Sequence, residues 1–266
     1  MLKNKQEKLN KIIQSDGKTV IIPMDHGVSG GPLKGIECPK TAVENISAGG
    51  ADAIIGHLGF YLHGYLDKQK ETQKLPVYIM HLSASSDLSP RKNYKVLVNS
   101  VEMAAQLGAD GVSVQVNIGG DNEPEMLMDM GKVAQECLKL GMPLLAMMYP
   151  RGHEIDNPND VKYAKIAARI GAELGADIVK TVYTGSPETF QEVVDGCPVP
   201  VVIAGGAKGD DLKCLQMIEG AIKAGGAGVS IGRGAFSHAN PTKMTQAVHA
   251  IVHGGKTAQE AMGMLG

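Results

Sequence analysis

A lysine interrupts an apolar run that otherwise reads as a buried strand. Lys180 lies within the segment Ile178–Val182, between Val179 and Thr181. An unpaired ammonium is costly in apolar surroundings, so such a lysine either pairs with a carboxylate or has a lowered pKa. A neutral amine is the nucleophile that forms a Schiff base with a ketone. Lys180 is therefore a candidate nucleophile, with an ion-paired strand-end lysine as the alternative.

Two further side chains follow apolar runs and could transfer protons. Asp25 follows the first run, and its carboxylate could accept a hydroxyl proton as a carbon–carbon bond breaks. The alternative for Asp25 is a turn or a helix cap. Tyr149 follows the fifth run, where a phenol among cations could donate a proton. The alternative for Tyr149 is a tyrosine that only packs and forms hydrogen bonds.

Glycines after the last two apolar runs indicate an anion site. Gly205-Gly206 and Gly232-Arg233 would offer backbone N–H groups close to a ligand, together with one planar cation. Arg151 adds a second cation. Barrel enzymes often bind phosphate with these two loops. The pattern favours a phosphorylated sugar as ligand.

The histidines and cysteines do not follow the spacing of metal sites. His26, His57, His63 and His81 lie at or near strand ends, but no H-x-H or H-E-x-x-H motif occurs. The four cysteines are far apart and form no C-x-x-C pair, so neither disulfides nor a structural zinc site is expected. We expect no metal or other cofactor.

Eight apolar, β-branched runs must position these residues. They are residues 19–24, 52–57, 76–81, 111–116, 143–148, 177–182, 200–204 and 228–232. Near-continuous apolar runs are typical of parallel strands buried on both faces. Helical patterns fill the gaps, so the sequence predicts an α/β fold, a (β/α)8 TIM barrel of parallel strands. An open doubly wound sheet is the alternative, although no G-x-G-x-x-G follows the first run.

The whole chain, residues 1–266, is expected to form one TIM-barrel domain, including an N-terminal helix in 1–17 and closing helices in 241–264. We expect a helix over 158–174 capped by Asn157 or Asn159, and a polar insertion at 60–75. Glycines such as Gly50, Gly108, Gly175 and Gly226 should end helices before strands.

The composition of the chain argues against nucleic acid and membranes as binding partners. The 266 residues include 34 glycines and no tryptophan, and the net charge is −2. No basic stripe suggests nucleic acid, since the lysines of the first dozen residues fit a solvated helix. No apolar signal core or 18-residue apolar run occurs, so we expect no membrane association and a cytoplasmic protein.

Several segments resemble the archaeal-type class I aldolases. They are Ile22–Ser29 with Gly31-Pro32, Met147–Gly152, Ile178–Gly185, Val202–Gly206 and Gly228–Arg233. The likeness extends over roughly residues 18–255. It departs from the family after Ser83, where Ala84-Ser85 replaces an expected glycine pair, and after Gly206, where Ala207 replaces a proline. These departures bear on the selectivity for the acceptor substrate.

The resemblance implies roles for matching positions. Lys180 would be the Schiff-base lysine, Asp25 the proton acceptor and Tyr149 the proton donor. The phosphorylated sugar would be held by Asp25, His26, Gly27, Val28, Ser29, Tyr149, Pro150, Arg151, Lys180, Gly205, Gly206, Gly232 and Arg233.

Within that family, the motifs favour a branch in aromatic amino acid biosynthesis. Its members condense a three-carbon unit of 6-deoxy-5-ketofructose 1-phosphate with L-aspartate semialdehyde to form 2-amino-3,7-dideoxy-D-threo-hept-6-ulosonate. A fructose-1,6-bisphosphate aldolase is the alternative, with Lys34 available for a second phosphate. A non-catalytic sugar-phosphate sensor is a remote third. The resemblance also implies a homo-oligomer, such as a decamer.

Overall fold

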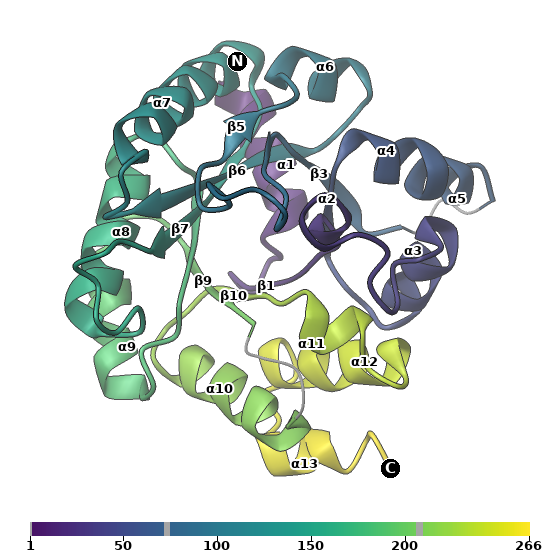
Figure 1. Cartoon of the computed structure of the whole chain (residues 1–266). Helices are drawn as coiled ribbons and strands as arrows, with labels where there is room; N and C mark the ends of the chain where they lie inside the picture. The colour runs from purple at the N-terminus through teal and green to yellow at the C-terminus, as the bar shows by residue number, and fades with distance from the viewer. Residues whose placement is uncertain (1, 72–74, 206–209) are drawn as a thin grey trace.

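Eight parallel strands close into a barrel in the order β1-β10-β9-β8-β7-β6-β3-β2, which confirms the predicted TIM barrel (Figure 1). The computed structural model describes residues 2–71, 75–205 and 210–266. The barrel strands are β1 (Thr19–Pro23), β2 (Ala53–Gly56), β3 (Val77–His81), β6 (Gly111–Ile118), β7 (Leu144–Pro150), β8 (Ile178–Thr181), β9 (Val201–Ala204) and β10 (Gly228–Ser230). Each overlaps one of the eight predicted runs; β6 and β7 extend two residues beyond theirs, so Tyr149 lies within β7 and not after it.

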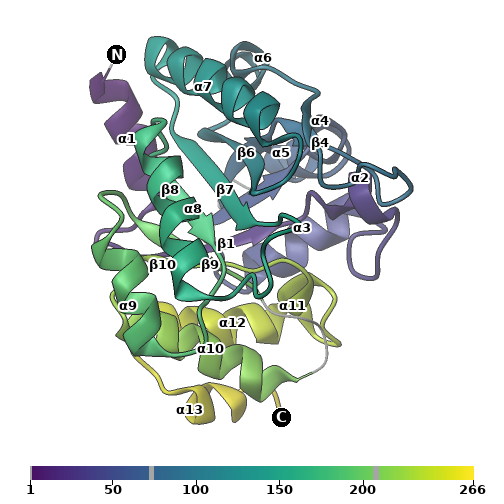
Figure 2. The ribbon, with the colours of Figure 1, turned by 60° about the vertical axis from the view of Figure 1, so that its left-hand side comes forward.

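Helices surround the barrel, as Figures 1 and 2 show. They are α1 (Leu2–Ile12), α2 (His26–Gly30), α3 (Pro39–Ala48), α4 (Leu58–Phe60), η1 (Tyr61–Tyr65), α5 (Leu66–Glu71), α6 (Val101–Gln106), α7 (Glu123–Leu140), α8 (Val161–Glu173), α9 (Pro187–Asp195), α10 (Asp211–Lys223), α11 (Arg233–Phe236), α12 (Pro241–Val252) and α13 (Ala258–Met262). No helix of the described residues is long and apolar enough to cross a membrane.

The apolar residues form an inner and an outer core. Side chains alternate along a strand, so Leu145, Met147 and Tyr149 of β7 join the cluster inside the barrel. Ala146 and Met148 join the outer cluster with the helices. The same alternation on β8 places Ile178 inside and Val179 outside. Lys180 is therefore expected on the interior side of its strand.

The N-terminal helix closes the bottom of the barrel. Ile12 of α1 is buried in the inner apolar cluster. Lys5 pairs with Asp177 at 2.9 Å, and Lys11 pairs with Asp110 at 2.9 Å. Most residues of the helix are exposed, as predicted for a solvated basic helix, and these two lysines neutralise carboxylates just before β8 and β6.

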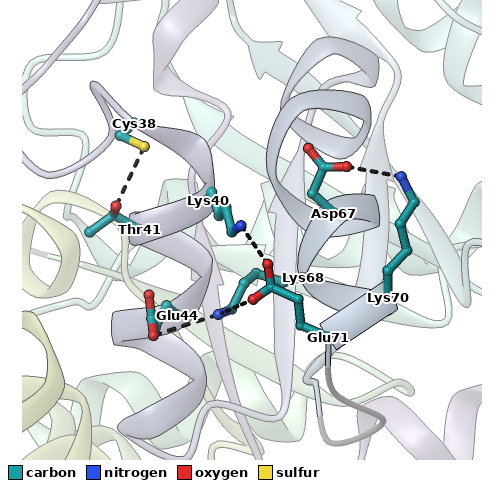
Figure 3. A network of polar contacts seen from close by, with 8 residues as sticks. All are labelled: Cys38, Lys40, Thr41, Glu44, Asp67, Lys68, Lys70 and Glu71. Atoms are coloured by element: carbon teal, nitrogen blue, oxygen red, sulfur yellow. Dashed lines mark hydrogen bonds and ion pairs between the residues drawn. The ribbon is translucent and has the colours of Figure 1, made fainter.

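Over its described part, the predicted polar segment at 60–75 is not an insertion but the helical connection between β2 and β3. Residues 58–71 form the consecutive helices α4, η1 and α5, and the Tyr61 and Tyr65 rings are buried. Figure 3 shows how α5 joins α3 on the surface. Glu71 lies 2.5 Å from the Lys40 ammonium and 2.9 Å from that of Lys68. Aromatic packing and these ion pairs explain the polar yet helical sequence.

Two local predictions need correction. Helix α8 is capped by Asp160, whose side chain accepts a hydrogen bond from the Lys162 backbone N–H, and not by Asn157 or Asn159. Before β10 the positive φ belongs to Gly225 (86°) and not to Gly226. In both cases several capping residues stand side by side, and only the exact end of the helix selects among them.

A separate two-stranded antiparallel sheet extends the mouth of the barrel. After β3 the chain forms β4 (Ser83–Ala84), which pairs with β5 (Val96–Leu97). The loop between them is tied to α2, because the Asp87 backbone N–H donates to the Ser29 carbonyl at 3.0 Å. This hairpin brings residues 83–97 to the carboxyl ends of the barrel strands.

Candidate active site

A cavity of about 740 Å³ opens at the carboxyl ends of the barrel strands. Eleven of the thirteen predicted site residues line it: Asp25, His26, Val28, Ser29, Tyr149, Pro150, Arg151, Lys180, Gly205, Gly232 and Arg233. Gly27 instead lines a neighbouring, more apolar cavity of about 410 Å³. Gly206 lies outside the described residues. The fold thus gathers residues from both ends of the chain into one space.

Lys180 lies at the inner end of this cavity and is only 5% exposed. Among the described residues, no carboxylate oxygen is within ion-pair distance of its ammonium nitrogen, so the ion-paired alternative is wrong. Burial lowers its pKa to about 8, an effect that Asp25 opposes and Arg151 reinforces. About a tenth of such an amine is neutral at pH 7, which makes it a competent nucleophile.

Asp25 stands between two histidines. Its Oδ1 is 3.4 Å from His26 Nδ1, and its Oδ2 is 3.8 Å from His81 Nε2. Although it precedes α2, its side chain makes no capping hydrogen bond. Burial alone would raise the pKa of the carboxyl, but His26, His81 and Lys180 together hold that pKa well below its usual range.

One oxygen of this carboxylate is left for a ligand. Asp25 Oδ1 and His26 Nδ1 are both buried, and no described residue gives either atom a hydrogen bond. These two atoms lie 3.4 Å apart and face one another. The other carboxylate oxygen, Oδ2, receives no hydrogen bond from a described residue, and a substrate hydroxyl in the cavity would give it one. Asp25 is thus placed to accept a hydroxyl proton.

His81 is a site residue that the sequence prediction omitted. Its ring is 3% exposed, and Nδ1 is 2.8 Å from Ser113 Oγ. The His57 ring meets it edge-on, with ring centroids 5.1 Å apart. Burial lowers the pKa of His81 to about 3, so the imidazole is neutral at pH 7. The signal was its strand-end position, which the sequence analysis weighed only for metal binding.

Tyr149 projects from β7 into the same cavity. The Arg151 guanidinium lies over its ring, 5.0 Å from the centroid. Burial raises the pKa of the phenol, so Tyr149 stays protonated at neutral pH. A protonated phenol facing a cavity with Asp25 and Lys180 can donate a proton to a reacting group.

The glycines after β9 and β10 permit close backbone packing. A Cβ at Gly205 would lie 2.7 Å from the Ile231 side chain, and one at Gly232 would lie 2.5 Å from the His26 ring. Arg233 begins the short helix α11 at the rim of the cavity. Lys34 lines the same side, because Ser237 just after α11 donates a hydrogen bond to its carbonyl, so two cations stand at this part of the rim.

The opposite rim carries charges that the sequence analysis did not single out. Lys95, Ser85 and Asp87 belong to the β4–β5 hairpin and line the cavity. No pattern marks Lys95, because only the hairpin turns it from a loop position toward the mouth. Across residues 2–71, 75–205 and 210–266, no cluster of three His, Cys, Asp or Glu side chains suits a metal ion.

Comparison with known proteins assigns the family. A model of the DeoC/LacD family aldolases matches residues 19–238. This chain belongs to the DeoC/LacD family of aldolases. The aldolase is 43% identical over 258 residues to the 2-amino-3,7-dideoxy-D-threo-hept-6-ulosonate synthase 1 of Archaeoglobus fulgidus, covering 97% of this chain and 94% of that relative. It is 39% identical over 262 residues to the 2-amino-3,7-dideoxy-D-threo-hept-6-ulosonate synthase of Halobacterium salinarum, covering 98% of this chain and 96% of that relative.

Among solved structures, the aldolase is similar to a Schiff base-forming fructose-1,6-bisphosphate aldolase. The TM-score is 0.86 at 28% identity, with 94% of this chain and all of the other covered. The resemblance found in the strand-end motifs is therefore confirmed at the level of family and fold.

Proposed function

We propose that this aldolase is a Schiff-base transaldolase that makes 2-amino-3,7-dideoxy-D-threo-hept-6-ulosonate. The donor would be 6-deoxy-5-ketofructose 1-phosphate and the acceptor L-aspartate semialdehyde. The names of two relatives about 40% identical over nearly the whole chain support this choice. A cytoplasmic location and a homo-oligomer stay predictions.

Lys180 would attack the donor ketone and form an iminium ion. That cation draws electrons from the adjacent carbon–carbon bond, which breaks when Asp25 accepts the neighbouring hydroxyl proton. A three-carbon phosphorylated aldehyde leaves, and a three-carbon enamine stays on Lys180. The enamine carbon adds to the aldehyde of the four-carbon acceptor. Hydrolysis then frees the seven-carbon product and the lysine.

Tyr149 would donate the proton that the newly formed alkoxide requires. Its raised pKa keeps that proton available, while the lowered pKa of Asp25 keeps the carboxylate ionised. An iminium ion supplies the electrophile, so this route requires no metal or other cofactor. His26 to Ser29, Pro150-Arg151, Gly205, Gly232 and Arg233 would hold the sugar and its phosphate.

The observation that carries the proposal is the buried Lys180, which has no ion-pair partner among the described residues and shares one cavity with Asp25 and Tyr149. Borohydride reduction in the presence of donor tests it directly, with mass analysis of the peptide that contains Lys180. We expect a donor-dependent adduct on Lys180 and none in Lys180→Met. An unmodified Lys180, or full turnover by Lys180→Met, would refute the mechanism.

A class I fructose-1,6-bisphosphate aldolase is the second candidate. The solved structure with TM-score 0.86 favours it, and Lys34 also lines the cavity and could meet a second phosphate. Both reactions would use Lys180, so trapping cannot separate them. Product analysis separates them: one assay supplies fructose 1,6-bisphosphate alone, and the other supplies the deoxyketo-sugar with L-aspartate semialdehyde. We expect the seven-carbon amino product only in the second assay and slow cleavage in the first.

A further inference from the structure

The β4–β5 rim of the cavity carries charges of both signs. Lys95 and Asp87 both line the cavity, on the hairpin that follows β3. In the barrel, β3 lies four strands from β9 in either direction, so this rim faces Gly205 across the mouth. The Gly205 side offers two cations, Arg233 and Lys34, and the Lys34 carbonyl accepts a hydrogen bond from Ser237 just after α11. The two sides therefore suit different ligand groups.

The Lys95 ammonium is fixed in place by its own hairpin. It donates a hydrogen bond to Ser85 Oγ at 2.6 Å. The Ser85 hydroxyl in turn donates to the Lys92 carbonyl at 2.6 Å, so its oxygen can only accept from Lys95. An ammonium has three donors, and this arrangement leaves two for a ligand. Ser85 is one of the residues that replace the glycine pair expected from the family resemblance.

A second cation adjoins Lys95 in the same cavity. Burial lowers the pKa of Lys95, and the neighbouring Arg151 guanidinium lowers it further, while Asp25 and Asp87 oppose the change. Two cations that repel one another at the wall of a cavity are stabilised by an anion between them. Among the described residues, no carboxylate lies within ion-pair distance of either one. A carboxylate ligand would fill that role.

Asp87 makes this rim selective. Its backbone is held by the hydrogen bond to Ser29, the residue lines the cavity, and its carboxylate has no ion-pair partner among the described residues. A carboxylate here opposes a second phosphate dianion but favours an ammonium. One cationic pair and one anion at the same rim match a zwitterion. In aspartate semialdehyde, a single methylene separates the amino-acid head from the reacting aldehyde.

We propose that Lys95, positioned by Ser85, and Asp87 form the subsite for the α-amino acid head of the acceptor aldehyde. Lys95 with Arg151 binds the carboxylate, and Asp87 binds the ammonium. This inference rests on the proposed function, because it specifies which part of that site receives the second substrate.

Three acceptor aldehydes, each assayed with the same donor, separate the contribution of the acceptor's carboxylate from that of its ammonium group. They are L-aspartate semialdehyde, succinate semialdehyde, which lacks the ammonium, and butanal, which lacks both charges. For Lys95→Met we expect the kcat/KM for L-aspartate semialdehyde to fall about tenfold or more relative to that for butanal. For Asp87→Asn we expect the preference for L-aspartate semialdehyde over succinate semialdehyde to fall about tenfold.

Matched controls exclude general effects. Lys92→Met removes an exposed lysine of the same hairpin, and Asp121→Asn removes an exposed carboxylate after β6; neither residue lines the cavity. Both should keep the wild-type ratios between acceptors. A damaged fold would lower all three acceptors together and leave the ratios unchanged.

The two proposals fail in different ways. If the wild-type enzyme forms no product from L-aspartate semialdehyde, the proposed function is refuted. If it forms product but Lys95→Met and Asp87→Asn keep its acceptor ratios, only this subsite is refuted. The subsite is likewise refuted if Arg233→Met, on the facing side, changes the ratios in place of Lys95→Met.

Discussion

The pKa of Lys180 should respond in opposite directions to its two charged neighbours. Burial lowers that pKa from 10.5 to about 8, Asp25 raises it, and Arg151 lowers it. Removing the carboxylate with Asp25→Asn should therefore lower the pKa further. Removing the guanidinium with Arg151→Met should raise it toward its ordinary value.

The lowering of the Lys180 pKa in the wild-type protein is large. At pH 7, an amine with a pKa of about 8 is about 9% neutral, whereas one at 10.5 is about 0.03% neutral. The cavity thus raises the population of the nucleophilic form about 300-fold, which corresponds to roughly 3 kcal/mol. Most of this gain comes from desolvation, so the wild-type profile should keep an inflection far below that of an ordinary lysine.

Reductive methylation measures the pKa of Lys180 without any need for substrate binding. Formaldehyde and cyanoborohydride are small reagents, and mass analysis of the peptide with Lys180 gives its rate from pH 6 to 11. The other lysine peptides of the same digest correct for the pH dependence of the reagent. We expect an inflection near pH 8, moving up in Arg151→Met and down in Asp25→Asn. An inflection above pH 10 in the wild type, or shifts of the same sign in both variants, would refute the electrostatic account.

Three further predictions concern other parts of the barrel. Tyr149→Phe should lower kcat about 100-fold or more while keeping the borohydride adduct on the lysine, because only proton donation is lost; loss of trapping instead would contradict this role. His253 bonds two carboxylates at 2.8 and 2.9 Å, which raise its pKa. The charged ring therefore stabilises the fold fully below about pH 6.5, and this contribution disappears as the pH rises through the higher folded-state pKa. His253→Gln should accordingly lower the Tm more at pH 6 than at pH 9, and equal losses would count against the linkage. Gly232→Ala should reduce both Tm and activity, since its Cβ would lie 2.8 Å from the Pro23 carbonyl oxygen; a variant with wild-type values would show that the turn can relax.

The strands were predictable because their environment is uniform. A strand buried on both faces must be apolar throughout, so Lys180 and the polar strand ends stand out against it. Barrel geometry then collects strand ends at one mouth, which is why Asp25 and Tyr149 could be grouped with a residue far away in the sequence. The wrong predictions concern helix ends, which neither strand burial nor barrel geometry specifies. Local patterns cannot choose between Gly225 and Gly226, or among Asn157, Asn159 and Asp160, without the final turn of the helix.

The sequence by itself determined the barrel, the family and the three residues of the proposed chemistry, because each depends on residue type within a repeated strand–helix pattern. The tertiary structure decided what surrounds them. It showed that Lys180 has no carboxylate within ion-pair distance among the described residues, that His81 is neutral beside Asp25, and that Lys95 faces the cavity. These properties depend on distances and desolvation between segments that only the closed barrel brings together.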